Sequence, residues 1–136
     1  MDSNSKRHYQ YELTELGDNR GGLIVLNSEG EIPFRIKRVF YIYKTQYGSI
    51  RGNHSNIDSS FVMISVNGSC IVEVDDGFQR TTYKLDSPTK ALYIEKGLWK
   101  TMKDFSDDNV LLVFSDNEYN PNEYINNYDD YVKLMK

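Results

Sequence analysis

Short hydrophobic runs separated by turn-forming residues fill the middle of the chain. They are rich in β-branched and aromatic residues and predict β-strands over residues 36–43, 61–66, 70–74, 81–85, 91–95 and 110–114. Asn67-Gly68, between the second and third runs, predicts a hairpin, and residues 75–77 (DDG) predict a further turn. Many short strands with regular turn signals are typical of a sandwich or barrel, so the pattern predicts an all-β fold.

The two ends of the chain differ from this strand-rich middle. Residues 1–10 are polar and lack the apolar segment of a signal peptide. At the other end, Asn120 and Pro121 suit the cap and the first residue of a helix. Apolar residues then recur at helical spacing and predict a helix over about residues 121–135 that packs outside the barrel. They are Tyr124, Tyr128, Tyr131, Val132 and Met135. We expect one domain spanning residues 1–136, with residues 1–10 as a leader.

Composition narrows the classes of partner. Hydrophobic residues make up 39% of the chain and charged residues 26%, which is ordinary for a globular protein. The formal net charge of −4 gives no electrostatic reason to expect a nucleic-acid or anionic-membrane partner. No apolar run approaches the roughly 20 residues of a membrane-spanning helix. The single cysteine, Cys70, cannot form an internal disulfide. The simplest location is therefore the cytoplasm.

The most informative candidate chemistry lies in residues 51–56, RGNHSN. Alternation along a strand places His54 and Asn56 on the same face. The stretch resembles the cupin active-site strand R-G-x-H-x-H, with asparagine in place of the second histidine. The only other histidine, His8, lies in the polar leader and has no partner motif.

Further segments, in their order and spacing, resemble the sugar-nucleotide 3,4-ketoisomerases of the cupin superfamily. They are residues 17–21 (GDNRG), 32–43 (IPFRIKRVFYIY), 51–54 (RGNH), 66–70 (VNGSC), 75–77 (DDG), 92–95 (LYIE), 98–99 (LW) and 104–106 (DFS). The resemblance covers about residues 10–131. It implies a double-stranded β-helix, the cupin jelly roll, with a C-terminal helix, and a homodimer that uses no metal or other cofactor.

The same resemblance implies a reaction and a ligand. The ketone of dTDP-4-keto-6-deoxyglucose would move from C4 to C3 by two proton transfers through an enediol, in deoxyamino-sugar and polysaccharide biosynthesis. The alternative is a non-catalytic cupin that binds sugar nucleotides as partner or regulator of an active paralogue. A paralogous cupin subunit that completes the site is also compatible with the sequence. A metal-dependent oxygenase is disfavoured because the ligands for a metal are missing.

The resemblance assigns proton transfer to His54 and Tyr41. Imidazole exchanges protons readily near neutrality, whereas Tyr41 is either an acid facing the substrate or a core tyrosine. Asn56 stands where the family has a histidine and cannot take up a proton, so it either holds a sugar hydroxyl or is a polar surface residue. Either His54 and Tyr41 handle both transfers, or the chain binds its ligand without turning it over.

The remaining candidates are substrate-binding residues. Arg51 and Arg20 are expected at the pyrophosphate, since guanidinium groups bind phosphate oxygens as a fork; an ion pair with Asp18 is the alternative for Arg20. Trp99 either stacks on the sugar or thymine or fills the core. Lys100 stands where the family has a further histidine, and it either contacts the ligand or is solvated. With two of three possible imidazoles absent, we expect no transition-metal site.

Overall fold

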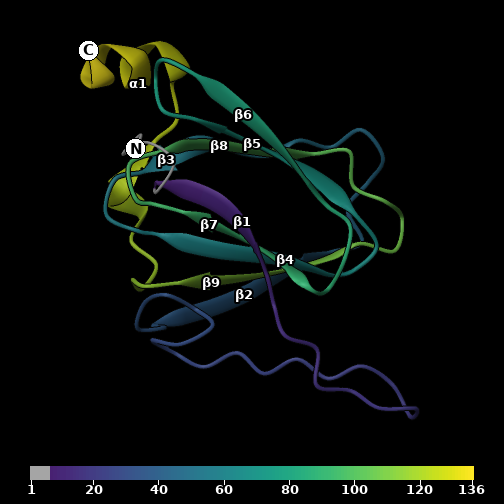
Figure 1. Cartoon of the computed structure of the whole chain (residues 1–136). Helices are drawn as coiled ribbons and strands as arrows, with labels where there is room; N and C mark the ends of the chain where they lie inside the picture. Colours follow the sequence, from purple (N-terminus) through teal and green to yellow (C-terminus); the bar gives the residue numbers. More distant parts are fainter. Residues whose placement is uncertain (1–6) are drawn as a thin grey trace.

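Two five-stranded antiparallel sheets face each other in this computed structural model, which describes residues 7–136 (Figure 1). The first sheet has the strand order β1-β7-β4-β9-β2 and the second β10-β3-β8-β5-β6. The first consists of β1 (His8–Glu12), β7 (Lys90–Ile94), β4 (Phe61–Asn67), β9 (Val110–Ser115) and β2 (Arg38–Tyr43). The second consists of β10 (Tyr124–Ile125), β3 (Arg51–Asn56), β8 (Trp99–Lys103), β5 (Cys70–Asp75) and β6 (Arg80–Leu85). A 3-10 turn (η2, Pro121–Glu123) and a helix (α1, Tyr128–Met135) complete the elements.

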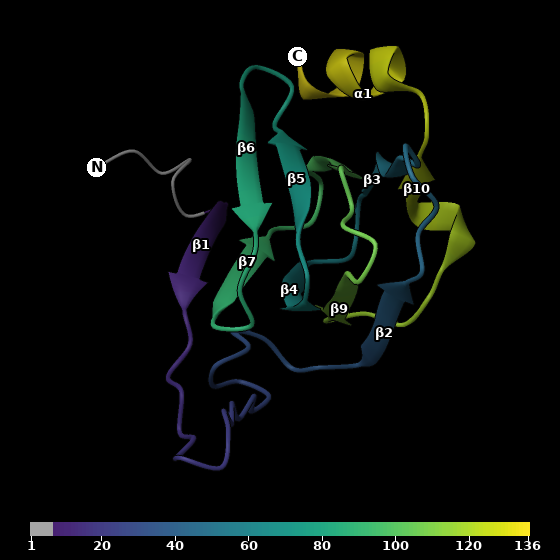
Figure 2. The same cartoon turned by 90° about the vertical axis from the view of Figure 1, so that its right-hand side faces the viewer.

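The chain passes repeatedly from one sheet to the other, as the view of Figure 2 makes plain. Asn67-Gly68 lies at such a crossing, because β4 and β5 belong to different sheets and do not pair. The predicted hairpin is therefore wrong, although the sharp turn is real: Gly68 has a φ of 67°, which favours glycine. The turn at residues 75–77 does join paired strands, β5 and β6.

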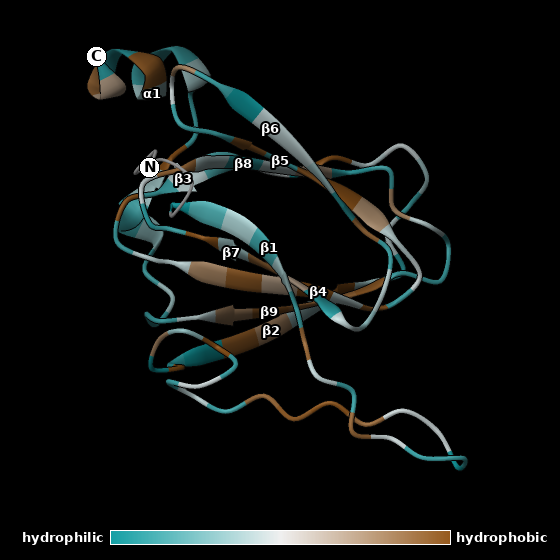
Figure 3. Ribbon diagram, viewed as in Figure 1, coloured by the Kyte–Doolittle hydropathy of each residue, from teal (hydrophilic) through white to brown (hydrophobic). Residues whose placement is uncertain are grey.

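Hydrophobic side chains gather in two places. The core between the sheets contains Phe61, Met63, Val72, Leu92 and Val113, among others. A second cluster lies outside the first sheet, where residues 13–37, here called the arm, cover part of it. Leu13 and Ile32 of the arm pack there with Val62 and Ile64 of β4. Figure 3 shows hydrophobic colouring along β2, β9 and part of the arm. The arm thus gives the first sheet two buried faces over part of its width.

Both predicted terminal segments need correction. The end of the supposed leader is strand β1, in which His8 pairs with Ile94; residues 1–6 lie outside the described residues. The C-terminal helix begins at Tyr128, with Asn127 as its cap, not at residue 121. Asn120 and Pro121 instead start the 3-10 turn η2. Within residues 7–136, neither helical element has the length and apolar character to span a bilayer.

The six strands predicted from hydrophobic runs are all present, with ends shifted by at most two residues. The hydrophobic pattern missed β1, β8 and the two-residue β10, and β3 was expected only from the resemblance. Strand β8 contains Lys100 and Thr101 yet is buried on both faces, so it lacks the alternation of hydrophobic and polar residues that marks a half-exposed strand. The fold as a whole confirms the expectation of an all-β protein with facing sheets and a C-terminal helix.

Candidate functional site

A pocket of about 180 Å³ opens between the two sheets. Strands β2 and β4 of the first sheet and β3, β8 and β10 of the second contribute its walls. The lining residues are Arg38, Phe40, Arg51, Gly52, His54, Asn56, Phe61, Met63, Lys100, Met102 and Tyr124. Its ionisable side chains, tyrosine aside, are all basic. A larger cavity of about 400 Å³ lies under the arm, but glutamate is the only ionisable residue there. We therefore place the candidate site between the sheets.

A bulge in strand β3 orients His54. The register with β8 shifts between Gly52 and His54, and Gly52 and Asn53 have φ values of 73° and 59°. A Cβ at residue 52 would meet Met102 Cε at 2.9 Å and the Lys100 carbonyl oxygen at 3.1 Å, so only glycine fits. The bulge brings the Gly52 carbonyl oxygen to 2.9 Å from His54 Nδ1.

That contact defines the protonation of the ring. A carbonyl oxygen can only accept, so Nδ1 donates the hydrogen bond and Nε2 is the nitrogen with a free lone pair. Burial, assisted by the charge of Lys100, lowers the pKa of His54 to about 4. The imidazole is therefore neutral at physiological pH. The Tyr124 ring lies against it, with ring centroids 4.7 Å apart.

Lys100 is the buried cation of the pocket. It is 3% exposed and lies directly opposite His54 in the register of β3 and β8. Its Nζ donates to Asn56 Oδ1 over 2.6 Å and lies 4.4 Å from the centroid of the Phe61 ring. Burial lowers the pKa of Lys100 to about 7; the negative charge of Glu123 opposes this shift and the positive charge of Arg38 adds to it.

Two donors in the pocket lack a partner among the described residues. They are Nδ2 of Asn56, whose side chain is 1% exposed, and Nε of Arg38. Leaving a buried donor unpaired costs about 1–3 kcal/mol. An oxygen-rich ligand in the pocket would satisfy both donors. The interpretation of Asn56 as a polar surface residue is excluded by its burial.

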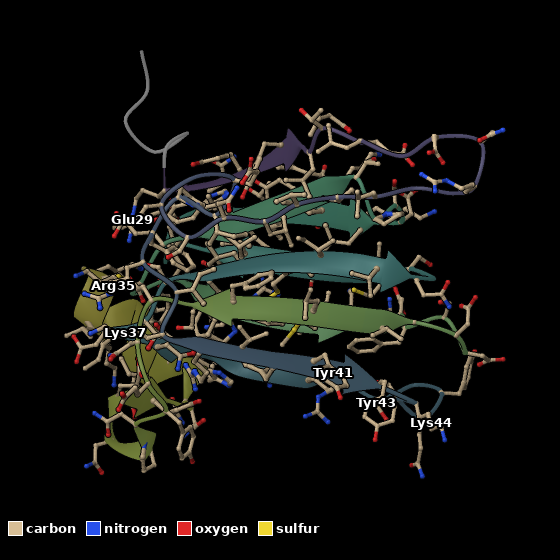
Figure 4. The ribbon with its side chains drawn as sticks, turned by 90° about the horizontal axis from the view of Figure 1, so that it is seen from below. Glu29, Arg35, Lys37, Tyr41, Tyr43 and Lys44 are labelled. Atoms are coloured by element: carbon tan, nitrogen blue, oxygen red, sulfur yellow. The ribbon has the colours of Figure 1, made fainter. Side chains whose placement is uncertain are left out.

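The structure corrects the predicted placement of Tyr41. Its side chain is 62% exposed and lies with Tyr43 on the outer side of edge strand β2 (Figure 4). Because neighbours on a strand point to opposite faces, Phe40 and Arg38 face the pocket instead. The structure therefore matches neither interpretation of Tyr41, as an acid facing the substrate or as a core tyrosine. A phenyl ring cannot exchange protons, so β2 supplies no acid or base here.

Trp99 and Arg20 also lie outside the pocket. Trp99 is 2% exposed and packs on the other side of β8, against Tyr128 and Tyr131 at α1. It therefore fills the core, as its neighbour Lys100 points the opposite way. Arg20 lies on an exposed turn of the arm and pairs with Asp18 over 2.6 Å, as the alternative reading expected.

The pocket unites four predicted residues, His54, Asn56, Lys100 and Arg51, of which Arg51 is exposed. Sequence reasoning missed Phe40 and Tyr124 as lining residues. Phe40 lies two residues after Arg38 and so shares its face of β2, whereas Tyr124 lies on a two-residue strand that only pairing with β3 creates. No three His, Cys, Asp or Glu side chains within residues 7–136 are close enough to form a metal site.

Comparisons with known proteins agree along nearly the whole chain. The family model described as FdtA: WxcM-like, C-terminal, matches residues 6–136. The chain is 40% identical over 118 residues to TDP-4-oxo-6-deoxy-alpha-D-glucose-3,4-oxoisomerase of Aneurinibacillus thermoaerophilus, which covers 87% of this chain and 85% of that protein.

Solved structures give the same result. A 3,4-ketoisomerase from Helicobacter canadensis matches with a TM-score of 0.91 and 38% identity over 94% of this chain and 96% of that one. A histidine-to-asparagine variant of the 3,4-ketoisomerase QdtA from Thermoanaerobacterium thermosaccharolyticum, in complex with TDP-4-keto-6-deoxyglucose, matches with a TM-score of 0.91 and 32% identity, covering 95% of this chain and 94% of that one. The cupin-like fold is thus confirmed, and the chain belongs to the FdtA family together with these sugar-nucleotide ketoisomerases.

Proposed function

We propose that this chain converts dTDP-4-keto-6-deoxyglucose into its 3-keto isomer. The relatives described above are 3,4-ketoisomerases, and one was solved with TDP-4-keto-6-deoxyglucose bound. The observation that carries the proposal is the neutral His54, whose Nδ1 donates to the Gly52 carbonyl oxygen and whose Nε2 has no hydrogen-bond partner among residues 7–136. Moving a ketone by one carbon needs a base that takes up a proton and returns it, and imidazole does both.

The pocket also suits the intermediate. When Nε2 of His54 removes the proton from C3, negative charge develops on the oxygen at C4. Donors already aimed at such an oxygen lower the barrier because they need no reorganisation. Asn56 Nδ2 and Arg38 Nε have no partner among the described residues, and the Lys100 ammonium lies beside Asn56. These three groups support an enolate in the pocket.

The nucleotide half of the ligand is assigned to Arg51. This residue begins β3 and lines the pocket while remaining exposed, so its guanidinium reaches a pyrophosphate outside the barrel. Arg51→Ala should weaken dTDP binding by about 10- to 150-fold in calorimetry, the range of charge-assisted hydrogen bonds. Arg20→Ala is the companion variant. If this variant binds dTDP as tightly as wild type does, Arg20 does not contact the phosphates. An unchanged affinity in the Arg51 variant would contradict the assignment.

Proton–deuterium exchange at C3 of dTDP-4-keto-6-deoxyglucose in D₂O, followed by NMR, tests the activity. Wild type should exchange this proton and form the 3-keto sugar. His54→Asn should lose at least about 10²-fold in rate while still binding dTDP. His8→Asn is the matched control, because His8 bonds Tyr83 outside the pocket and should leave the rate unchanged. A wild type that binds dTDP but shows neither exchange nor product would leave the non-catalytic binding protein as the function.

The working unit is proposed to be a homodimer. The outer face of β2 exposes Val39, Tyr41 and Tyr43 by 52%, 62% and 57%, and a contiguous exposed apolar face is typical of an interaction site. Light scattering should give twice the monomer mass, and Tyr41→Asp with Tyr43→Asp should halve it. A monomeric wild type would refute this.

We place the reaction in the cytoplasm, in the biosynthesis of deoxyamino sugars for polysaccharides, because its 3-keto product is suited to amination.

A further inference from the structure

Lys100 has an unusual environment for a lysine. Its ammonium is buried in a pocket whose other charged or ionisable side chains, tyrosine aside, are basic, and its one hydrogen bond among the described residues goes to a neutral amide, that of Asn56. No carboxylate of residues 7–136 lies within 4.0 Å of Nζ. A buried charge without an opposite partner is costly and is retained mainly where it has a use. Accepting the isomerase function proposed above, we infer that Lys100 is the acid–base residue that transfers protons between the two oxygens of the sugar.

The position of Lys100 supports this division of work. It lies opposite His54 across adjacent strands, so two basic groups stand side by side on one wall of the pocket. Its hydrogen bond to Asn56 Oδ1 fixes Nζ at the residue that stands in place of the second histidine of the family pattern. Asn56 is a positioning residue here, because an amide cannot exchange protons near neutrality.

The charges around Lys100 keep it responsive to pH. His54 and Arg51 face the pocket from β3, Arg38 faces it from β2, and Glu123 acts from η2. The Glu123 carboxylate accepts from Asp58 N and from Ser59 Oγ, so it is engaged away from Nζ. Arg38 and burial favour the neutral amine, and the pKa of Lys100 falls to about 7. A group that is half protonated at neutral pH both gives and takes a proton.

The steps balance as follows. His54 Nε2 takes the proton from C3, the C–H electron pair forms the C3–C4 double bond, and the carbonyl π pair moves to the C4 oxygen. The Lys100 ammonium donates a proton to that oxygen, giving the enediol. The neutral Lys100 amine then takes the proton from the C3 hydroxyl as C3=O forms, while the His54 imidazolium returns its proton to C4. Both residues recover their starting states, and no oxidant or metal is consumed.

A purely electrostatic role for Lys100 makes a different prediction, and Lys100→Arg separates the two. Arginine keeps the positive charge but cannot release a proton at neutral pH. If Lys100 shuttles protons, the arginine variant still supports proton removal from C3 by His54 and fails in the later transfers. The rate of exchange at C3 should then stay near that of wild type, while the rate of formation of the 3-keto sugar falls. If Lys100 only stabilises charge, both rates should stay close to those of wild type.

The experiment measures both rates in D₂O by NMR for wild type, Lys100→Arg, Lys100→Met and the control Lys103→Arg. Lys103 lies on the same strand but pairs with Glu73 outside the pocket. The proposal expects Lys100→Arg to exchange C3 within about 10-fold of wild type, yet to form product at least about 10²-fold more slowly. Lys100→Met should lose product formation by a similar factor, and Lys103→Arg should match wild type. Product formation by wild type should also decline as pH rises above about 7, where Lys100 loses its proton.

Each other outcome has a definite meaning. Product formation by Lys100→Arg within threefold of wild type overturns the inference in favour of an electrostatic role. Loss of C3 exchange and product formation together in that variant, with dTDP binding intact, also overturns it, because Lys100 would then act in the first step. An inactive wild type that binds dTDP refutes the isomerase function itself. That failure is visible before any variant is compared.

Discussion

The buried ammonium of Lys100 should leave a measurable signature in the stability of the protein. Burial lowers the pKa of this lysine from 10.5 to about 7 in the folded state. Between these values the unfolded chain binds a proton that the folded chain does not, so the free energy of unfolding rises with pH. For one such group, the rise between pH 7 and pH 9 amounts to about 2 kcal/mol. Replacing Lys100 by methionine, of similar length, should abolish this rise.

Urea unfolding at a series of pH values measures the effect. The probe is the fluorescence of Trp99, which is the only tryptophan of the chain and is buried. Lys100→Met should also be more stable than wild type near pH 7. That gain is less than the full charge-burial cost, because the Asn56 carbonyl loses its donor, at about 1–3 kcal/mol. Lys103→Met removes an ammonium from the same strand and should keep the slope of wild type.

Other groups do not obscure this comparison. Burial lowers the pKa of His54 to about 4, so its contribution to stability changes below pH 6.5. Burial raises the pKa of Cys70 to about 11, which affects wild type and variant alike. If the Lys100→Met variant gains as much stability between pH 7 and pH 9 as wild type does, Lys100 is not the buried charge described here and the reasoning fails.

Three further predictions follow from the same contacts. Because the pKa of His54 is lowered to about 4, its base form persists in mild acid, so the acidic limb of the pH–rate profile should lie nearer pH 4 than pH 6.5; a limb at pH 6.5 would contradict this. Asn56→Asp places a carboxylate beside Lys100 and should raise its pKa, shifting the basic limb of the profile to higher pH, and an unchanged limb would count against the pair. Tyr131→Phe removes the hydroxyl whose hydrogen the Asp75 and Gly97 carbonyl oxygens share, the first contact buried and the second part-buried, and should lower the free energy of unfolding by about 1–3 kcal/mol, read by urea unfolding with wild-type dTDP binding as the control.

Local patterns identified much of the candidate site. His54 and Asn56 share a face because the strand alternates, and both line the pocket as expected. Alternation says which residues go together but not which face is inside, and β2 has apolar residues on both faces. Its outer face holds Val39, Tyr41 and Tyr43, whereas its pocket face includes the polar Arg38. The resemblance alone placed Tyr41 at the substrate, and the pattern of β2 offered nothing to correct it.

Tertiary pairing explains the remaining differences. Asn67-Gly68 has the chemistry of a tight turn, but the sequence near a turn does not say whether its flanking strands pair with each other. Here the flanking strands pair with distant ones: β4 pairs with β9, and β5 pairs with β8. Near the C-terminus, Asn120 and Asn127 both cap a helical turn, and the two-residue strand between them exists only because β3 lies beside it. In both cases the structure depends on a strand distant in the sequence, so the local sequence could not predict it.

The bulge at Gly52 has a consequence for chemical selectivity. In many enzymes a carboxylate orients the catalytic imidazole, and its negative charge makes that ring a stronger base. The Gly52 carbonyl oxygen orients His54 without a formal charge, while burial and the charge of Lys100 lower the pKa of the ring and keep it a weak base. Such a base removes only hydrogens that a neighbouring ketone has already made acidic. An ordinary sugar that entered the pocket would remain intact, because none of its C–H bonds lies beside a ketone.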